Sequence, residues 1–317
     1  MLLPIGVFLS TVAAICNASC GASSAVSNLT IQASGTPERL AVSRAPVSNP
    51  GEIDLYAFPM TSTSTPVATL ASTNEAPLGL AFDETGRLFG AAGDGRIKVY
   101  DPPFRSGANP AFILTTGGGA LAFDRGGDLF IGGGDVIRNC GTRFHFIPEI
   151  TPKIKVVNAP ITGSSTVTFT IAEPTTCGGY LVSDIAFDGA GNLWAAIVGR
   201  LDEFSPPFTS NSTPALSIST CASSLGFDSA GNMYVDGCDG IDVFQPPFTS
   251  SMTKAYTISS AAEVDSIVFD SAGNMYARSL VPFSSTNGLQ VFAPPFSSTS
   301  QPITTFSGNF AGVAAGR

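Results

Sequence analysis

The sequence predicts an all-β protein, a six-bladed β-propeller whose blades are four-stranded antiparallel sheets. Three observations lead to this prediction. A hairpin motif recurs five times, a proline-closed third strand follows it, and parts of a sixth unit stand at the two ends of the repeat region. The composition agrees, because 34 glycines and 23 prolines among 317 residues suit many short strands joined by turns. Repeats of this kind are typical of propellers.

Each copy of the hairpin motif has a short apolar stretch ending in Phe-Asp, a turn containing glycine, and a second apolar stretch. This pattern predicts two antiparallel strands joined by a tight turn. The glycine permits a positive φ, and the aspartate can accept hydrogen bonds from backbone amides across the turn. We therefore interpret the aspartates as turn residues rather than metal ligands. They are Asp83, Asp124, Asp188, Asp228 and Asp270, and the turn glycines are Gly86, Gly127, Gly191, Gly231 and Gly273.

A third strand follows each hairpin, as in IKVYDPPF from Ile97, and a short fourth strand comes next, as in PALSI from Pro214. The phenylalanines before the turn aspartates are separated by 41, 64, 40 and 42 residues, which is the repeat length of propeller blades. The long interval contains an insertion, because the segment from Ile154 aligns without gaps with the segment from Ile97. We place a loop at about residues 133–152, between the second and third strands, and a smaller surplus at about 173–182.

Closure of the ring can also be predicted. The C-terminal FAGVAAGR supplies an innermost strand at about residues 310–316, and three segments within about residues 37–70 resemble the second, third and fourth strands of a blade. A sixth blade built from both ends would remove the open edge of the sheets. The predicted propeller domain therefore covers residues 37–317.

The N-terminal segment differs from the repeats. The stretch from Leu2 to Cys16 is almost wholly apolar, and no charged residue precedes Glu38. The stretch is too short to span a bilayer and suits a signal peptide over residues 1–20, followed by a flexible tether over 21–36. Cys20 could be acylated as in a bacterial lipoprotein, although Asn17 stands where such signals usually have leucine. Lipid anchoring and simple cleavage both stay open, and both predict export to the cell envelope or the medium.

The repeats resemble those of NHL-repeat and related extracellular six-bladed propellers over about residues 37–317. This resemblance places ligand sites at the face formed by the links between blades and the turns between second and third strands. Gluconolactonase-like and regucalcin-like enzymes hold a divalent metal there with inner-strand carboxylates. Here Asp184 and Asp265 are weak candidates, because they occupy different registers and should point to opposite sides of their strands. No cofactor is expected, and a divalent metal is the alternative.

Catalytic groups are few. The one histidine, His145, lies in the inserted loop, and a streptogramin-lyase-like propeller would need a catalytic histidine at the channel mouth. Our leading hypothesis is a monomeric, non-catalytic module that binds a protein, glycan or small ligand through the loop-rich face. A metal-dependent lactonase-type hydrolase or a streptogramin-type lyase is the alternative, and a structural envelope protein is a third. The expected contact residues are Arg138, Arg143, Phe144, His145, Phe146 and Glu149.

Charge and cysteines complete the prediction. A net charge of −9 would repel a phosphate backbone, so nucleic acid is not an expected partner, and membrane contact is expected only through a lipid anchor. Cys221 and Cys238 lie six residues before Phe227 and six after Asn232, which places them on one rung of a hairpin and predicts a disulfide. Cys140 and Cys177 would then pair with each other, since both lie in the surplus segments. Free buried thiols are the alternative.

Overall fold

The computed structural model describes residues 38–44, 51–71, 76–140, 148–177, 179–259, 263–280 and 287–316. All of them belong to one compact unit, Ala33–Arg317. The predicted signal peptide and tether, with Cys20, lie outside the described residues. Within these ranges the chain forms no helix that is long and apolar enough to cross a membrane.

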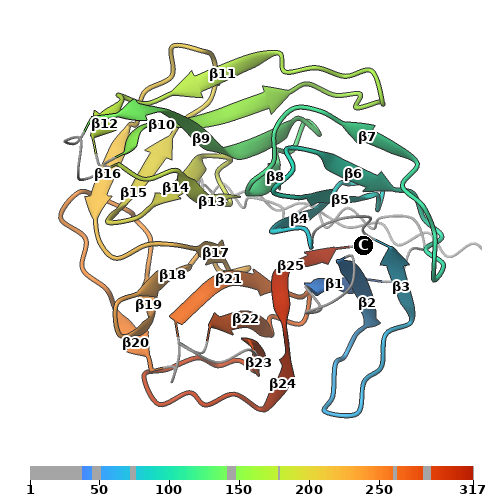
Figure 1. Cartoon of the computed structure of the whole chain (residues 1–317). Helices are drawn as coiled ribbons and strands as arrows, with labels where there is room; N and C mark the ends of the chain where they lie inside the picture. Colours follow the sequence, from blue (N-terminus) through green and yellow to red (C-terminus); the bar gives the residue numbers. More distant parts are fainter. Residues whose placement is uncertain are drawn as a thin grey trace, which may run out of the picture. The chain divides into compact units, whose positions relative to one another are not determined.

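The described strands form six antiparallel sheets arranged as blades of a ring (Figure 1). Blade 1 contains β4 (Gly79–Phe82), β5 (Leu88–Ala91), β6 (Ile97–Tyr100) and β7 (Phe112–Leu114). Blade 2 contains β8 (Leu121–Phe123), β9 (Leu129–Asn139), β10 (Pro148–Val157) and β11 (Phe169–Ala172), with the short β12 (Thr176–Cys177) paired to β10. Blade 3 contains β13 (Val182–Phe187), β14 (Leu193–Ile197), β15 (Arg200–Phe204) and β16 (Leu216–Ser219).

The remaining blades follow the same order. Blade 4 contains β17 (Leu225–Phe227), β18 (Met233–Gly237), β19 (Gly240–Phe244) and β20 (Tyr256–Ile258). Blade 5 contains β21 (Glu263–Phe269), β22 (Met275–Leu280), β23 (Asn287–Phe292) and β24 (Thr304–Gly308). Blade 6 contains β25 (Phe310–Gly316), β1 (Arg39–Arg44), β2 (Glu52–Ala57) and β3 (Ala68–Ala71). The predicted fold class is therefore confirmed.

Ring closure follows the predicted scheme. The C-terminal β25 is the inner strand of blade 6 and pairs with β1, with Val42 opposite Val313. Its other neighbours are the inner strands β4 of blade 1 and β21 of blade 5. The inner strands thus contact one another around a complete circle, and the sheet edge that faces the axis is protected at every blade.

The hairpin turns form because the aspartate accepts backbone N–H groups and the glycine permits a positive φ. In all five turns, the aspartate Oδ1 accepts the backbone N–H of the residue four positions later at 2.8–2.9 Å. The glycine between them has a φ of 82–89°, which disfavours residues with a Cβ. The interpretation of these aspartates as turn residues is confirmed. These turns lie on one face of the ring, which we call the hairpin face; the links between blades lie on the opposite, loop-rich face.

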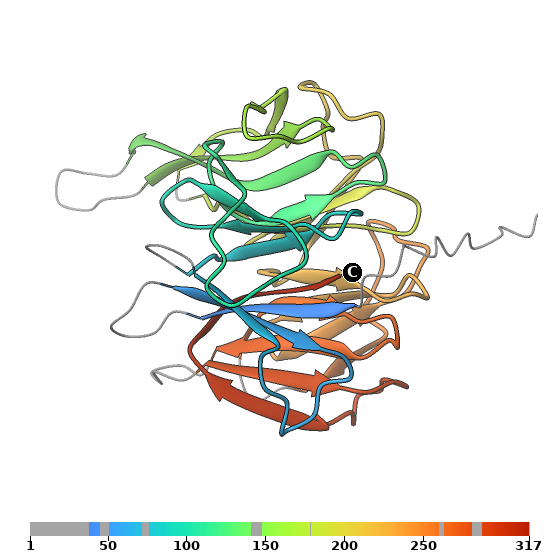
Figure 2. The ribbon, with the colours of Figure 1, turned by 90° about the vertical axis from the view of Figure 1, so that its right-hand side faces the viewer.

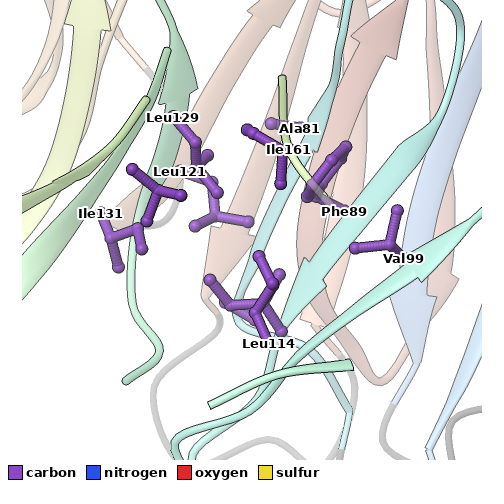
Figure 3. Close-up of a cluster of buried hydrophobic side chains, with 11 residues drawn as sticks. Ala81, Phe89, Val99, Leu114, Leu121, Leu129, Ile131 and Ile161 are labelled. Atoms are coloured by element: carbon purple, nitrogen blue, oxygen red, sulfur yellow. The ribbon is translucent and has the colours of Figure 1, made fainter. Parts of the chain in front are cut away.

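The core lies between the blades rather than within a single layer. Between blades 1 and 2, for example, Phe89 and Val99 pack with Leu121 and Leu129 of the next blade, and Ile161 completes the cluster (Figure 3). Equivalent clusters fill the other interfaces. Because each blade buries its apolar faces only against its neighbours, the ring must be complete to form a continuous core.

The predicted loop at about residues 133–152 is wrong in part. Strands β9 and β10 form a ladder from Val157 opposite Leu129 to Pro148 opposite Asn139, with one bulge at Ile137. The hairpin reaches out at the left of Figure 2. Backbone groups that would otherwise need water are satisfied in the ladder, so the insertion extends a sheet. The smaller surplus contains β12, which pairs with β10 on its other side.

Candidate functional site

The centre of the ring contains a cavity of about 320 Å³, and most of the residues that line it are apolar. Each inner strand contributes one aliphatic residue at the same register, and these residues are almost fully buried in the clusters between the blades. The polar side chains among its lining residues are those of Asp184 and Ser266. The six aliphatic residues are Leu80, Leu121, Ile185, Leu225, Ile267 and Val313.

Asp184 joins two blades through backbone amides. A bulge in β13 precedes it, and its Oδ1 accepts the N–H of Ile185 at 2.9 Å. Its Oδ2 accepts the N–H of Leu225, in blade 4, at 3.0 Å. Burial raises the pKa of this carboxyl to about 7, although the two backbone hydrogen bonds oppose that rise. The side chain therefore connects blades 3 and 4 and changes charge near neutral pH.

Asp265 has a different environment. It is the extra residue of a bulge in β21, and its carboxylate forms an ion pair with Arg278. The same guanidinium donates to the carbonyl oxygen of Phe310 in β25 at 2.8 Å, and burial lowers the pKa of Arg278 to about 10. The contacts of Asp184 and Asp265 are thus separate. Among the residues described, no three His, Cys, Asp or Glu side chains come together in a way that could hold a metal ion.

Sequence reasoning missed a β-bulge at these positions: Asp265 is a bulge residue, and Asp184 comes directly after one. The inner strands β13, β21 and β25 each carry one unpaired residue at equivalent positions, namely Ser183, Asp265 and Ala311. In the repeat, each of these three residues lies two positions before the aliphatic residue of its inner strand, namely Ile185, Ile267 or Val313. A bulge has no separate sequence signature here, because serine, aspartate and alanine share no property that would require one.

The predicted contact loop is described only at its base. Arg138 on β9 lies opposite Glu149 on β10, and Glu149 also lies beside Cys177 of β12. The side chain of Glu149 is half-buried. The other expected contact residues, Arg143, Phe144, His145 and Phe146, lie outside the described residues. Their role stays a prediction.

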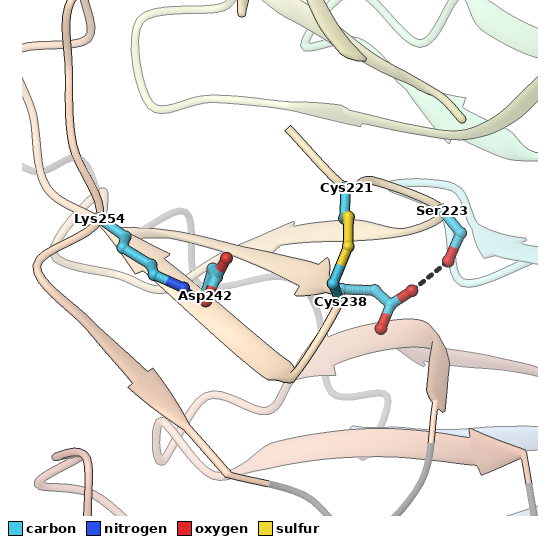
Figure 4. Close-up of a disulfide and its surroundings, with 6 residues drawn as sticks. Cys221, Ser223, Cys238, Asp242 and Lys254 are labelled. Carbon is cyan, nitrogen blue, oxygen red and sulfur yellow. Dashed lines mark hydrogen bonds and ion pairs between the residues drawn. A yellow bond between two sulfur atoms is a disulfide. The ribbon is translucent and has the colours of Figure 1, made fainter. Parts of the chain in front are cut away.

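The disulfide between Cys221 and Cys238 is confirmed, with 5.5 Å between the Cα atoms (Figure 4). It joins the link before β17 to the turn between β18 and β19, on the loop-rich face. Nearby, Ser223 donates a hydrogen bond to Asp236. Cys140 also takes part in a disulfide. Strand pairing places the backbone of Cys177 next to that of Glu149, at the base of the same hairpin, and pairing of Cys140 with Cys177 stays a prediction.

An apolar patch on the loop-rich face was also missed. It consists of Val136, Ile137, Tyr180, Leu181 and Val198, whose exposed fractions are 40–58%. The elements that carry these residues are neighbours: a Cβ added at Gly134 would meet the Leu181 side chain, and Val182 pairs with Ile197, next to Val198. The sequence signal was two pairs of adjacent apolar residues in the surplus segments, Val136 with Ile137 and Tyr180 with Leu181.

A groove of about 340 Å³ begins at the edge of this patch. Val198 and Gly199 border it on blade 3, and the disulfide Cys221–Cys238 with Asp236 borders it on blade 4. The patch and the groove form a continuous surface across blades 2, 3 and 4.

Solved structures confirm the architecture. No family model matches the chain, and no curated protein matches it. A protein of unknown function from Bacteroides caccae superposes with a TM-score of 0.60 at 11% identity, over 88% of this chain and 99% of that one. A protein from Lactobacillus plantarum gives 0.57 at 13% identity, over 89% and 99%. Raptor from Chaetomium thermophilum gives 0.54 at 14% identity, over 85% of this chain and 23% of that one.

The chain has a β-propeller fold. At these identities the likeness shows the fold alone, because propellers serve many unrelated functions. The resemblance to NHL-repeat, gluconolactonase-like and streptogramin-lyase-like propellers stays a prediction.

Proposed function

We propose that this β-propeller is a non-catalytic binding module that works outside the cytoplasm and holds a protein partner on its loop-rich face. The apolar patch carries this proposal. Exposed apolar side chains scattered singly are ordinary, but five that lie on adjoining elements of one face are typical of interaction sites. Monomeric β-propellers have no structural need for such a patch, because their core is complete between the blades.

The patch rests on rigid supports. β9 and β10 form a long ladder with one bulge, and β12 flanks β10 on its other side. The disulfide Cys221–Cys238 fixes the far end of the adjoining groove. Preorganised surfaces lose less conformational entropy on binding, which favours affinity.

Charged groups lie near two parts of the apolar patch. Lys153 and Asp135 form an ion pair beside the hairpin, and Arg200 bridges Glu173 and Asp202 next to Val198. An apolar centre with a polar rim is the usual composition of a protein interface. Among the three ligand classes that the sequence left open, this arrangement favours a protein over a glycan or a small ligand.

Export is supported by the disulfide Cys221–Cys238, since such bonds persist in oxidising compartments. The enzyme alternative receives less support from the site. Both oxygens of Asp184 accept backbone N–H groups, so its role in joining blades is already accounted for. Metal analysis with a lactone-hydrolysis screen tests this alternative: turnover with stoichiometric metal would replace the binding proposal.

The binding proposal is tested with matched point variants. Ile137→Asp introduces a charge within the apolar patch, and Ile303→Asp introduces the same charge at a similarly exposed outer position. Proteins of the producing cell envelope and medium are captured on the wild type and both variants. We expect a partner that the wild type and Ile303→Asp retain and that Ile137→Asp loses. A partner retained equally by all three, or self-association that accounts for the patch, would refute the proposal.

The insertion as a whole is tested by a deletion. Replacing residues 134–150 with a short Gly-Ser linker removes most of the insertion and leaves the four strands of blade 2 in place. We expect the ring to fold and the captured partner to be lost. Unchanged affinity would show that the insertion is a neutral extension.

A further inference from the structure

A second cavity of about 450 Å³ lies on the hairpin face, between blades 2 and 3. Its floor is aromatic: the Phe130 ring centroid lies 5.0 Å from that of Phe187 and 5.2 Å from that of Phe208. Its polar lining includes Asp124 and Asp128, from the β8–β9 turn. The volume is that of a small-molecule site.

Blade 1 shows what fills the equivalent place. There Arg87 Nε donates to Asp83 Oδ2 at 2.6 Å, and an Arg87 NH group donates to the carbonyl oxygen of Ile161 at 3.0 Å. The guanidinium carbon lies 5.4 Å from the ring centroid of Phe89 and 6.0 Å from that of Phe112. The protein thus encloses its own cation between one carboxylate and two aromatic rings.

Blade 2 repeats this enclosure without the cation. Asp124, Phe130 and Phe169 stand at the positions of Asp83, Phe89 and Phe112, and all three line the cavity. The position of Arg87 is taken by Asp128. The repeat therefore has a second carboxylate where its neighbour has a guanidinium.

The two carboxylates have unused oxygens. Asp124 Oδ1 accepts the N–H groups of Gly126 and Asp128, at 2.8 and 2.9 Å, and Asp128 Oδ1 accepts the N–H of Ala159 at 2.7 Å. The Oδ2 atom of each has no partner among the residues that the structure describes. Arg125 also lines the cavity, and its guanidinium donates to the carbonyl oxygen of Gly189.

The other three hairpins satisfy the same atom. An asparagine side chain donates to the aspartate Oδ2 at 2.8–2.9 Å, and a tryptophan or tyrosine adds a second donor at 3.0–3.3 Å. In blade 1 Arg87 is the donor to this atom. Among the five described hairpins, blade 2 alone has no side-chain donor to the aspartate Oδ2, since it carries Asp128 and Phe130 at the donor positions.

We propose that this cavity binds a guanidinium group of a ligand, in the place that the Arg87 head group occupies in blade 1. A guanidinium can donate to two carboxylates in one plane and stack on an aromatic ring, whereas an alkylammonium is a point charge with a stronger hydration shell. The net charge of −9 also favours a cationic ligand. The group could come from a free small molecule or from an arginine side chain of a peptide.

Calorimetry with the full chain tests this proposal. The probes are agmatine as a free guanidinium compound, Gly-Arg-Gly as a peptide arginine, and butylamine as an ammonium control. We expect agmatine or the peptide to bind and butylamine to bind at least about tenfold more weakly. Binding of agmatine alone identifies a small-molecule site, and binding of both admits a peptide. No binding of either guanidinium probe, or equal binding of butylamine, would overturn the proposal.

Variants locate the site. Asp128→Arg restores the blade 1 arrangement, so its own guanidinium should fill the cavity and abolish probe binding without lowering the melting temperature. Asp124→Asn keeps the shape and should weaken binding about tenfold or more. Asp101→Asn removes the same charge at an exposed position on the same face and should leave affinity unchanged. If Asp128→Arg fails to fold, Asp124→Asn decides: affinity equal to that of the wild type refutes the site.

Discussion

Asp184 in blade 3 accepts a hydrogen bond from the backbone N–H of Leu225 in blade 4, with 3.0 Å between Oδ2 and nitrogen. This contact crosses a blade interface next to the central cavity, where no other titratable side chain is among the lining residues. Its energetic contribution therefore depends on the protonation of one carboxyl.

The first prediction concerns pH. Burial raises the pKa of Asp184 from 3.8 to about 7, so between these values the folded chain binds more protons than the unfolded chain. The free energy of unfolding should therefore fall as pH rises through this window. Asp184→Asn is neutral throughout, so the stability of the wild type relative to this variant should fall by on the order of 2–4 kcal/mol from about pH 4 to about pH 8. Urea titrations at both pH values measure this difference, and a constant difference would contradict it.

The second prediction concerns the disulfide Cys221–Cys238, which closes a segment with a sequence separation of 17. Replacing both cysteines with serine should lower the free energy of unfolding by about 3 kcal/mol, because the unfolded chain regains conformational freedom. Urea denaturation of the wild type under reducing conditions should show at least this loss, because the reductant also opens the disulfide of Cys140. Peptide mapping without reductant also tests the second pair: recovery of Cys177 joined to Cys221 would exclude both predicted pairings.

The third prediction concerns closure. Because β1, β2 and β3 complete blade 6, a chain that begins at Ala71 should lose the partners of β25 and should not unfold cooperatively. A chain that begins at Ala22 removes only residues before the first described strand and serves as the control. Calorimetric melting distinguishes them. Equal cooperativity and equal monomer content in the two chains would show that the closure is dispensable.

The fourth prediction concerns the hairpin turns. The buried hydroxyl of Tyr276 donates to Asp270 Oδ2 at 3.0 Å, and burial, reinforced by the charge of Asp270, raises the pKa of this hydroxyl. Tyr276→Phe should lower the free energy of unfolding by about 1–3 kcal/mol, since the carboxylate loses a donor. Tyr180→Phe, at an exposed position, should change it by less than about 0.5 kcal/mol. Denaturant titration measures both, and similar losses would refute the role of the hydrogen bond.

The repeat made much of the fold predictable, because each hairpin requires the same turn residues in the same order. The closure was predictable for a related reason: an inner strand without a second strand implies that the missing strands lie elsewhere. The extension of β9 and β10 was not, since the segment from Gly132 to Cys140 shows no regular alternation of apolar and polar residues.

The buried aspartates of the third strands were also not predicted from the sequence. Asp54, Asp202 and Asp242 stand at one register of the third strands, and each accepts a hydrogen bond from a hydroxyl on the fourth strand at 2.5–2.7 Å. They could have been noticed as acidic residues aligned within apolar strands. The cavity of blade 2 had a visible signal too, since Asp128 departs from the asparagine or arginine of the other copies. The sequence shows that Asp128 replaces an asparagine or arginine, but it does not show that this replacement leaves a cavity.

The pairing of β1 with β25 also has a consequence for biosynthesis. The two strands come from opposite ends of the repeat region, so β1 keeps an unsatisfied edge until the last blade has been made. During that interval, β25 of a second copy of the protein can pair with β1 in the same register as the chain's own β25. Refolding at high concentration should therefore yield interlinked oligomers in which each ring is closed by its neighbour, and dilution or slow synthesis should favour rings that close on themselves.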